Sequence, residues 1–396
     1  MDAGVVVLDS GSHTVKAGYA SAGIDEREPR VVTPTRCSVY PPGANPAEAG
    51  GAATLVSPVH RGAVTDWEAL ESIWHYTVFE QLGWIEGEEG GLMITAPLVW
   101  SRRDREVAAQ VAFEGLNASG AFIADAGVCS LYSVGKTSGF AVDVGHGKID
   151  VSAVYEGVLN LGASATCPHN AGDDLEARFR AALGGAAPED EEGLRQLKEQ
   201  CVRCPTNAAE EASVSGTSAY TLPDGRSFSV PDAVGMDLGA CLYEPGRMRA
   251  KHGDADGDGL AQRLARLVIA LPQGPQEQRR AVYDNVVVCG GAHGVPGLKE
   301  RLGRELKQYS PLALPSAGTS AGVAPGVGIA GPSTSSAVSA QVLEKLPDYL
   351  PSHVLGVSTF LGAAVCAKVS VWSGSQHVTK ADYDEQGPRA IAKCSV

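Results

Sequence analysis

Two stretches of the sequence join an acidic residue to a glycine-containing turn between apolar segments. In the first, the apolar residues 5–8 precede Asp9, the polar turn 10–13 follows, and residues 14–19 alternate apolar and polar side chains. Glycine and serine make the bend permissive and rich in donors, which predicts a strand, a tight turn and a second strand. Turn N–H groups of this kind can face phosphate oxygens while the carboxylate holds Mg²⁺ through water. An ordinary turn without a ligand is the alternative.

The second stretch repeats this pattern further along the chain. Residues 140–155 run from an apolar strand through Asp143 into the turn 144–147, and then into another alternating strand. The recurrence of one pattern indicates a duplicated module. Two such hairpins that face one another can clamp a single phosphate tail from both sides.

Composition bounds the class of protein. The 396 residues are enough for two domains with real cores, and 44% hydrophobic with 20% charged residues is typical of globular proteins. The net charge of −14 and the pI near 5.1 argue against a nonspecific grip on DNA, so we expect no direct sequence-specific DNA binding. Nine cysteines, an odd number, and a first segment without a secretory apolar core favour a reducing compartment. No run of 18 apolar residues is present, so we expect no membrane span.

The segments around the hairpins alternate strand and helix patterns. Ser101 is placed to cap a helix with Asp104 as the acid of a capping box, and Thr379 with Asp382 repeats this arrangement. The predicted elements are strands 92–96, 122–124 and 285–289, a hairpin turn at 222–226, and helices 67–81, 128–134, 175–183, 260–271, 297–308 and 381–386. This alternation predicts an α/β architecture. Residues 312–345 are rich in Ala, Gly, Ser and Pro, which predicts a disordered insertion.

Several motifs together resemble those of the actin family, nearly end to end apart from residues 312–345 and a loop near 41–56. They are DSGS at 9–12 with KAGY at 16–19, VTDW at 64–67 with WH at 74–75, SLY at 130–132, DVGHG at 143–147, YEG at 155–157, LPDG at 222–225, GG at 290–291, and TKADYD at 379–384 with GP at 387–388. Within the family, LGWIEG at 82–87, VGHGKID at 144–150 and QHVTKADYD at 376–384 resemble the plant-type nuclear actin-related proteins of subfamily seven.

The resemblance implies an actin-like two-domain α/β fold, with duplicated mixed-sheet modules around a nucleotide cleft. The implied small domain is 1–133 plus 355–396 (subdomains 1 and 2). The implied large domain is 134–354 (subdomains 3 and 4), and it contains the insertion. ATP or ADP with Mg²⁺ would lie between the two hairpins.

Site residues carry over by position. Gly11 and Ser12 would meet the terminal phosphates, Lys16 would reach them from the first domain, and Gly145 and Gly147 would complete the clamp. The carboxylates implied to hold the waters of the metal are Asp9 and Asp143. The residues implied to approach the ribose and base, or to let the backbone come close to the nucleotide, are Lys198, Glu199, Gly290 and Gly291. For the first two of these, a solvated pair on an acidic helical stretch is the alternative.

The departures from the family pattern fall on the chemistry. Ala126 stands where the family has the glutamine that orients the attacking water, and Asp150 stands where it has a water-ordering histidine. Phosphoryl transfer depends on positioning and electrostatics, so we expect hydrolysis to be very slow or absent. His13 and His146 occupy the two turns, where they can either donate to phosphate or narrow the turn and exclude a γ-phosphate.

Two functions are compatible with this pattern. The first is a non-catalytic structural subunit of a chromatin-remodelling complex, located in the nucleus with a cytoplasmic pool. It would bind a helix of the remodelling ATPase, either alone or beside a second actin or actin-related protein, through residues near 155–157 and 349–360 and the segment around Val371. It would contact chromatin indirectly. The second is a slowly hydrolysing, ATP-binding cytoskeletal protein, against which Ala126 and Asp150 argue.

Overall fold

The computed structural model describes residues 4–20, 28–39, 53–84, 90–247, 258–271, 276–309, 340–343, 346 and 350–394. The chain packs into two compact units. Unit 1 comprises Met1–Arg178, Val287–Gly294 and Lys345–Val396, and unit 2 comprises Phe179–Val286 and Val295–Glu344. Most of the predicted insertion at 312–345 lies outside the described residues. The predicted division after residue 133 separates the two hairpins, whereas both belong to unit 1 when the chain is divided by packing; the four-subdomain division stays a prediction.

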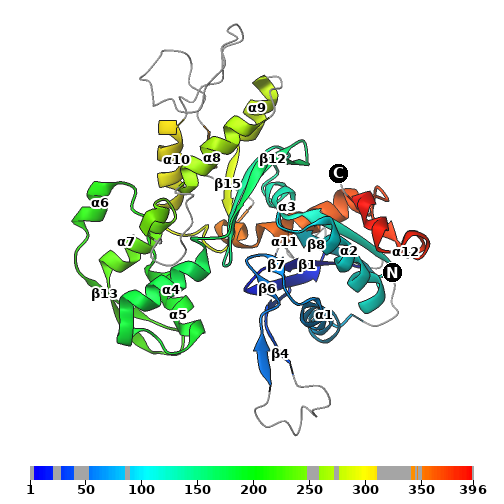
Figure 1. Cartoon of the computed structure of the whole chain (residues 1–396), viewed down its shortest axis with the longest axis horizontal. Coiled ribbons are helices and arrows are strands. Elements are labelled where there is room, and N and C mark those ends of the chain that lie inside the picture. Colours follow the sequence, from blue (N-terminus) through cyan, green and yellow to red (C-terminus); the bar gives the residue numbers. More distant parts are fainter. Residues whose placement is uncertain are drawn as a thin grey trace. The chain divides into compact units, whose positions relative to one another are not determined.

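The described helices and strands confirm the mixed α/β architecture (Figure 1). The strands are β1 (Val5–Ser10), β2 (Thr14–Tyr19), β3 (Val31–Pro34), β4 (Cys37–Val39), β5 (Thr54–Val56), β6 (Val59–His60), β7 (Ala63–Val64), β8 (Gly91–Ala96), β9 (Gly120–Asp125), β10 (Gly139–Val144), β11 (Ile149–Tyr155), β12 (Val158–Cys167), β13 (Thr217–Thr221), β14 (Ser227–Pro231), β15 (Val286–Cys289) and β16 (Val378–Thr379). The α-helices are α1 (Trp67–His75), α2 (Arg102–Gln110), α3 (Ala126–Tyr132), α4 (Gly172–Leu183), α5 (Glu191–Cys201), α6 (Ala208–Ser213), α7 (Asp232–Cys241), α8 (Leu260–Ala270), α9 (Gln276–Tyr283), α10 (Leu298–Tyr309), α11 (Ser358–Cys366) and α12 (Lys380–Gln386).

The first predicted hairpin forms the centre of a six-stranded sheet in unit 1. Its strand order is β16-β9-β8-β1-β2-β3, with β1, β8 and β9 parallel and β1–β2 antiparallel. The apolar residues of β1 are buried because helices cover the sheet, and Trp74 of α1 is fully buried beside its end. The Trp74 indole N–H donates to Ser10 Oγ at 2.8 Å, which fixes the residue just before the turn.

The second predicted hairpin lies in a four-stranded sheet of order β12-β11-β10-β15. Strands β10 and β11 are antiparallel. In the strand register Asp143 lies opposite Asp150, as Asp9 lies opposite Lys16 in the first hairpin. The strand β12 was not predicted, because its sequence VLNLGASATC is rich in small residues with weak strand preference. The antiparallel hydrogen bonds to β11 stabilise the strand despite this weak preference.

Helices α3 and α11 pack against each other, α3 also against β10 and α11 also against β1. The contact is close because Gly362 lies directly on the backbone carbonyl of Cys129, and the Ser130 and Thr359 hydroxyls hydrogen bond at 3.0 Å. By length and composition alone, the helical run His353–Val371 could cross a membrane, with a mean hydropathy of 1.8. Core helices pass the same test, and 56% of this run is buried within the protein.

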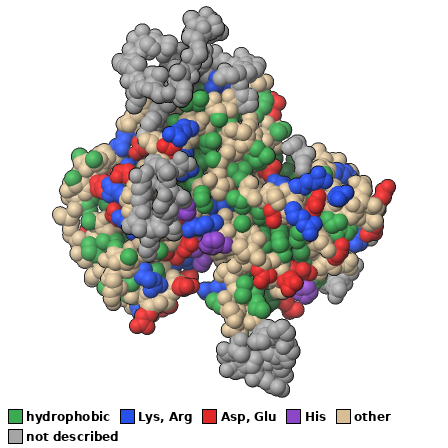
Figure 2. All heavy atoms as spheres, viewed as in Figure 1, with side chains coloured by type: hydrophobic (Ala, Val, Ile, Leu, Met, Phe, Trp, Pro, Cys, Tyr) green, Lys and Arg blue, Asp and Glu red, His purple; other side chains and the backbone are tan. Residues whose placement is uncertain are grey.

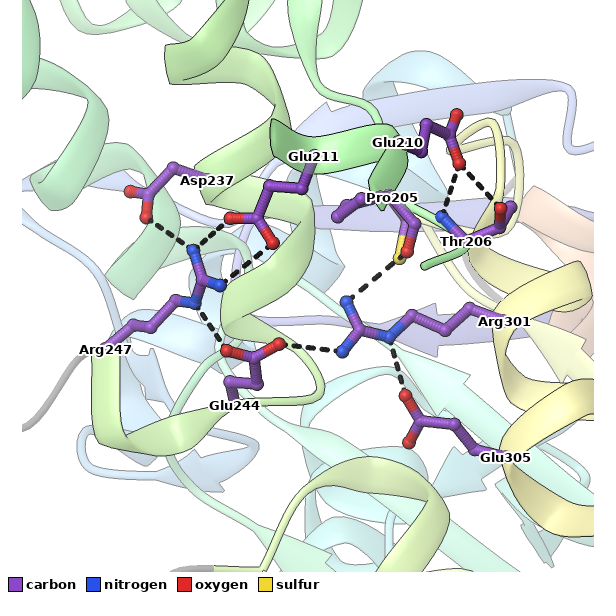
Figure 3. Close-up of polar contacts among 10 residues, drawn as sticks. Pro205, Thr206, Glu210, Glu211, Asp237, Glu244, Arg247, Arg301 and Glu305 are labelled. Carbon is purple, nitrogen blue, oxygen red and sulfur yellow. Dashed lines mark hydrogen bonds and ion pairs between the residues drawn. The ribbon is translucent and has the colours of Figure 1, made fainter. Parts of the chain in front are cut away.

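In unit 2, a network of two arginines joins α6, α7, α10 and the loops beside them (Figure 3). Glu244 accepts hydrogen bonds from both arginines, from Arg301 at 2.9 Å and from Arg247 at 2.7 Å. Arg247 also bonds Glu211, and Arg301 also bonds Glu305. The network therefore ties elements that are far apart in the sequence.

Both predicted capping boxes are present, at the first residues of α2 and of α12. The predicted helix 67–81 begins at Trp67 but is regular only to His75; it continues to Gln81 as a wider helix with longer hydrogen-bond spacing. The predicted 222–226 turn joins β13 to β14 as expected. These elements were predictable because each depends on residues that are close in the sequence.

Candidate nucleotide site

The turns of the two hairpins have the same backbone hydrogen bond. The Gly11 N–H donates to Thr14 O at 2.9 Å, and the Gly145 N–H donates to Lys148 O at 3.0 Å. Each glycine stands two residues after the aspartate of its hairpin. The duplication predicted from the sequence is thus present in the backbone geometry. The N–H groups of Gly11 and Gly145 are therefore used in hydrogen bonds within the turns.

In the first turn, one buried residue holds the carbonyl groups. Thr35 is only 1% exposed, and its hydroxyl donates to Gly11 O at 2.8 Å while its N–H donates to His13 O at 2.8 Å. The C=O and N–H of one trans peptide point in opposite directions. Because the Gly11 carbonyl faces Thr35, the Ser12 N–H faces the other way, as a phosphate donor requires.

In the second turn, the start of α4 performs the same task. The Gly172 N–H donates to Gly145 O at 3.1 Å, and the Asp173 N–H donates to His146 O at 2.7 Å. By the same argument, the Gly147 N–H faces away from α4. In both turns, backbone carbonyl groups accept hydrogen bonds from a neighbouring segment. The N–H of the same peptide group then points away from that segment.

The two predicted metal carboxylates carry different local partners. Asp9 accepts a hydrogen bond from the Thr95 hydroxyl at 2.7 Å, and its other oxygen lies 3.5 Å from the Lys16 ammonium. Burial raises the pKa of Asp143; Asp150 and Asp9 raise it further, and Lys148 and Lys16 oppose this. A divalent cation beside Asp9 and Asp143 would favour their ionised forms, so the residues fit water-mediated Mg²⁺. Among the described residues no group of three or more His, Cys, Asp or Glu is arranged to hold a metal directly.

Asp150 is neutralised within the protein. It forms an ion pair with Lys148, accepts from the Thr166 hydroxyl at 2.6 Å, and is 4% exposed. Sequence reasoning treated it as an acid facing a polyphosphate. The structure gives its charge a partner, and its oxygens are used by that partner and by Thr166. These contacts hold the Asp150 side chain in place.

The two turn histidines lie beside one another, with ring centroids 4.8 Å apart and planes tilted by 42°. His146 Nδ1 lies 3.8 Å from a carboxylate oxygen of Glu176. Ser12 is also close to the second turn, because a Cβ built on Gly147 would lie 2.6 Å from its hydroxyl. The tips of the turns are thus in contact through side chains.

The glycine pair after β15 divides into two roles. Gly290 has a φ of +83°, and a Cβ built on it would lie 2.1 Å from Asp143 Oδ1 and 2.7 Å from Val144 O. A Cβ on Gly291 would meet nothing within 4 Å. Gly290 is therefore required by the second hairpin itself, whereas Gly291 has open space where a side chain would lie.

The arrangement of two matched hairpins agrees with the family comparison. The chain matches the family model described as Actin over residues 1–189 and 185–395. The chain belongs to the actin family. This family fold, predicted from the motifs, is confirmed.

Three relatives show where in the actin family the similarity lies. Actin-related protein 7 of Arabidopsis thaliana is 32% identical over 400 residues, covering 98% of this chain and 99% of that protein. Actin-related protein 7 of Oryza sativa subsp. indica is 30% identical over 394 residues, 98% of each chain. Actin-related protein 2 of Saccharomyces cerevisiae is 26% identical over 423 residues, 98% of this chain and 97% of that one. The predicted resemblance to subfamily seven is confirmed.

The remaining residues that the actin family pattern suggested lie in unit 2. Lys198 and Glu199 are both on α5, where Lys198 is 7% exposed and Glu199 accepts from Arg195 at 2.7 Å on the surface. The alternative reading of a solvated pair therefore describes Glu199 but not the buried Lys198. Their approach to a nucleotide stays a prediction.

Ala126 is the first residue of α3, directly after Asp125, which is ion-paired with Arg105. Its methyl group has no hydrogen-bonding atom, so it cannot orient a water. Sequence reasoning missed Arg61 and Asp174, which form a two-pronged ion pair beside the turns. They are 113 residues apart, and no spacing pattern connects them.

Proposed function

We propose that this chain is a non-catalytic actin-related structural subunit of a SWI/SNF-type chromatin-remodelling complex, which supports gene regulation by binding a helix of the remodelling ATPase. The observation that carries the proposal is the match to actin-related protein 7 along the whole chain, combined with Ala126 and Asp150 at the positions of the water-orienting residues. We place the protein in the nucleus, with a cytoplasmic pool.

The phosphate site supports a binding role in preference to a catalytic one. The N–H groups of Ser12 and Gly147 and the carboxylates of Asp9 and Asp143 suit ATP or ADP with Mg²⁺. Neither Ala126 nor the ion-paired Asp150 can position an attacking water. Bound nucleotide would then serve as a structural ligand.

Two exposed valines on the helical run His353–Val371 support partner binding. Val365 is 41% exposed and Val369, one helical turn further, is 72% exposed. Both valines belong to the segment around Val371 that the sequence analysis chose, whereas Val371 and Phe360 themselves are each only 1% exposed. The choice of contact segments stays a prediction. Two valines one turn apart suit the apolar face of an amphipathic partner helix.

Acidic and basic side chains are interspersed on the face shown in Figure 2, with no continuous basic stripe in the described part of that face. Together with the net charge of −14, this favours indirect contact with chromatin through partners.

Replacing both exposed valines by aspartate (Val365→Asp with Val369→Asp) is expected to weaken binding to the remodelling ATPase at least tenfold. Two charges would have to be desolvated in an apolar interface, at a cost of about 2 kcal/mol or more. Co-purification from nuclear extract and titration with the isolated ATPase helix provide the measurement. Ile269→Asp is the matched control, because Ile269 is 48% exposed on α8 in unit 2. Unchanged binding of the double variant, or deletion of the ATPase helix without loss of the complex, would contradict the proposal.

Purified protein incubated with ATP and Mg²⁺ is expected to release no phosphate above the uncatalysed background over several hours. The cause is the absence of a water-positioning side chain, which typically costs several orders of magnitude in rate. Chromatography of the nucleotide released on denaturation separates binding from turnover. Steady turnover together with sedimenting polymer would instead favour the cytoskeletal function.

A further inference from the structure

The segment between β6 and β7 contacts both phosphate-facing turns. Its residues Arg61 and Gly62 have positive φ angles of 50° and 81°, which makes a sharp bend. The Gly62 N–H donates to the Ser12 hydroxyl of the first turn at 3.0 Å. Gly147 of the second turn lies so close that a Cβ on it would be 3.1 Å from the Arg61 Cα. One short bend therefore contacts the tips of both hairpins.

The Arg61 side chain fixes this bend to the start of α4. Its two terminal nitrogens donate to the two oxygens of Asp174, at 3.2 and 2.9 Å. The Asp174 side chain is 8% exposed and that of Arg61 is 20% exposed. Two parallel charge-assisted hydrogen bonds define a fixed geometry, and shielding from water strengthens them. Asp174 directly follows the two residues whose amides hold the second turn, Gly172 and Asp173.

Trp100 and Lys148 also contact the bend, both at Gly62. The Trp100 indole N–H donates to Gly62 O at 3.2 Å. The stem of Lys148 passes directly under Gly62, since a Cβ there would lie 2.2 Å from Lys148 Cε. The Lys148 ammonium is in turn paired with Asp150. The bend is thus linked to β10–β11 through Lys148 as well as to α4 through Arg61.

We propose that the Arg61–Asp174 ion pair is a latch that holds the two phosphate-facing turns together without any nucleotide. Arg61 and Asp174 are positioning residues: Gly62 holds the first turn, the α4 start holds the second, and the ion pair joins these two holders. Closure in this chain is supplied by its own side chains, where a polyphosphate and its metal would otherwise have to bridge the turns. The inference concerns the turns alone and is independent of the proposed partner.

A double-mutant cycle tests the latch in the full-length protein. The variants are Arg61→Asn, Asp174→Asn and the two combined. Asparagine tolerates a positive φ, so Arg61→Asn removes the guanidinium without straining the bend. Each single variant is expected to lower the melting temperature by roughly 5 °C, because it leaves a shielded charge without its partner. The double variant is expected to be no less stable than either single one.

Amide exchange supplies the readout that a general loss of stability would not move. We expect the singles to speed exchange at residues 11–14, 61–62 and 145–148 at least tenfold, while α8 and α10 stay unchanged. The surface pair of Arg226 and Asp190 in unit 2 is the matched control, and Arg226→Asn is expected to change neither quantity.

Removal of bound ligand completes the test. Wild-type protein treated with EDTA and a nucleotide-degrading enzyme is expected to keep the amide protection of the two turns. Loss of amide protection at the two turns on this treatment, additive effects of the two single substitutions, or single variants that behave like Arg226→Asn would each overturn the latch. Loss of partner binding in the valine variants tests the proposed function separately, because Val365 lies on α11 and Val369 lies just after its end.

Discussion

Gly290→Ala is expected to destabilise unit 1 by about 3 kcal/mol, whereas Gly291→Ala changes stability by less than about 0.5 kcal/mol. At Gly290 the φ of +83° strains any residue with a Cβ, and the added methyl would lie 2.1 Å from Asp143 Oδ1. A shift of the Asp143 side chain would not relieve the clash, because the methyl would also lie 2.7 Å from the backbone oxygen of Val144. Both residues belong to β10, whose backbone is held in the sheet. The two neighbouring glycines are thus expected to differ in their effect on stability, because only Gly290 lacks space for a methyl group.

Urea denaturation followed by far-ultraviolet circular dichroism measures this difference. The comparison between the two glycines is well matched, since both have the same chain context and the same chemical change. Gly291→Ala also lowers the entropy of the unfolded chain, which offsets any small loss. Equal destabilisation by both substitutions would show that the contact between Gly290 and Asp143 does not limit stability. A second outcome concerns ligand: because Gly291 faces open space, its substitution is expected to weaken nucleotide binding without altering the fold.

The hairpins, the capping boxes and the family were predictable because each rests on residues adjacent in the sequence. A strand, an aspartate and a glycine turn are coded within about ten residues, and a capping box within four. The duplicated pattern added a second, independent indication of the same fold. The Lys148–Asp150 pair also had a signal, since residues two apart in an extended segment share a face. The sequence analysis considered Asp150 without Lys148 and so missed their ion pair.

The contacts that hold the site could not be predicted in this way. Thr35 hydrogen bonds to Gly11 of the first turn, 24 residues away in the sequence, and Arg61 pairs with Asp174, 113 residues away. Such pairs form because the sheets bring distant segments together, and single-sequence patterns do not encode which segments meet. Which valines of the helical run His353–Val371 face outward was also not predictable, because the run is apolar on several sides and composition does not distinguish them.

Arg301→Met is expected to cost unit 2 about 3 kcal/mol. The Arg301 side chain is 10% exposed and connects Glu305 on α10 with Glu244 after α7, at 2.6 and 2.9 Å (Figure 3). It also lies over the Tyr243 ring, 4.6 Å from its centroid. Methionine fills similar volume but leaves the carboxylate of Glu305, itself 16% exposed, without its counter-ion. Removing one partner of a shielded ion pair is costly for that reason.

Because Glu244 also binds Arg247, part of the network survives, so the loss is expected to fall short of complete unfolding. Arg301→Lys separates charge from geometry: lysine keeps the positive charge but cannot bond two carboxylates in one plane, and an intermediate loss of about 2 kcal/mol follows. Arg226→Met, at an exposed pair in the same unit, is expected to cost under about 1 kcal/mol. Amide exchange resolves where the stability is lost. Faster exchange confined to α7 and α10, with the two hairpins of unit 1 unchanged, identifies the network as the local clamp of unit 2, and a loss spread evenly over both units refutes it.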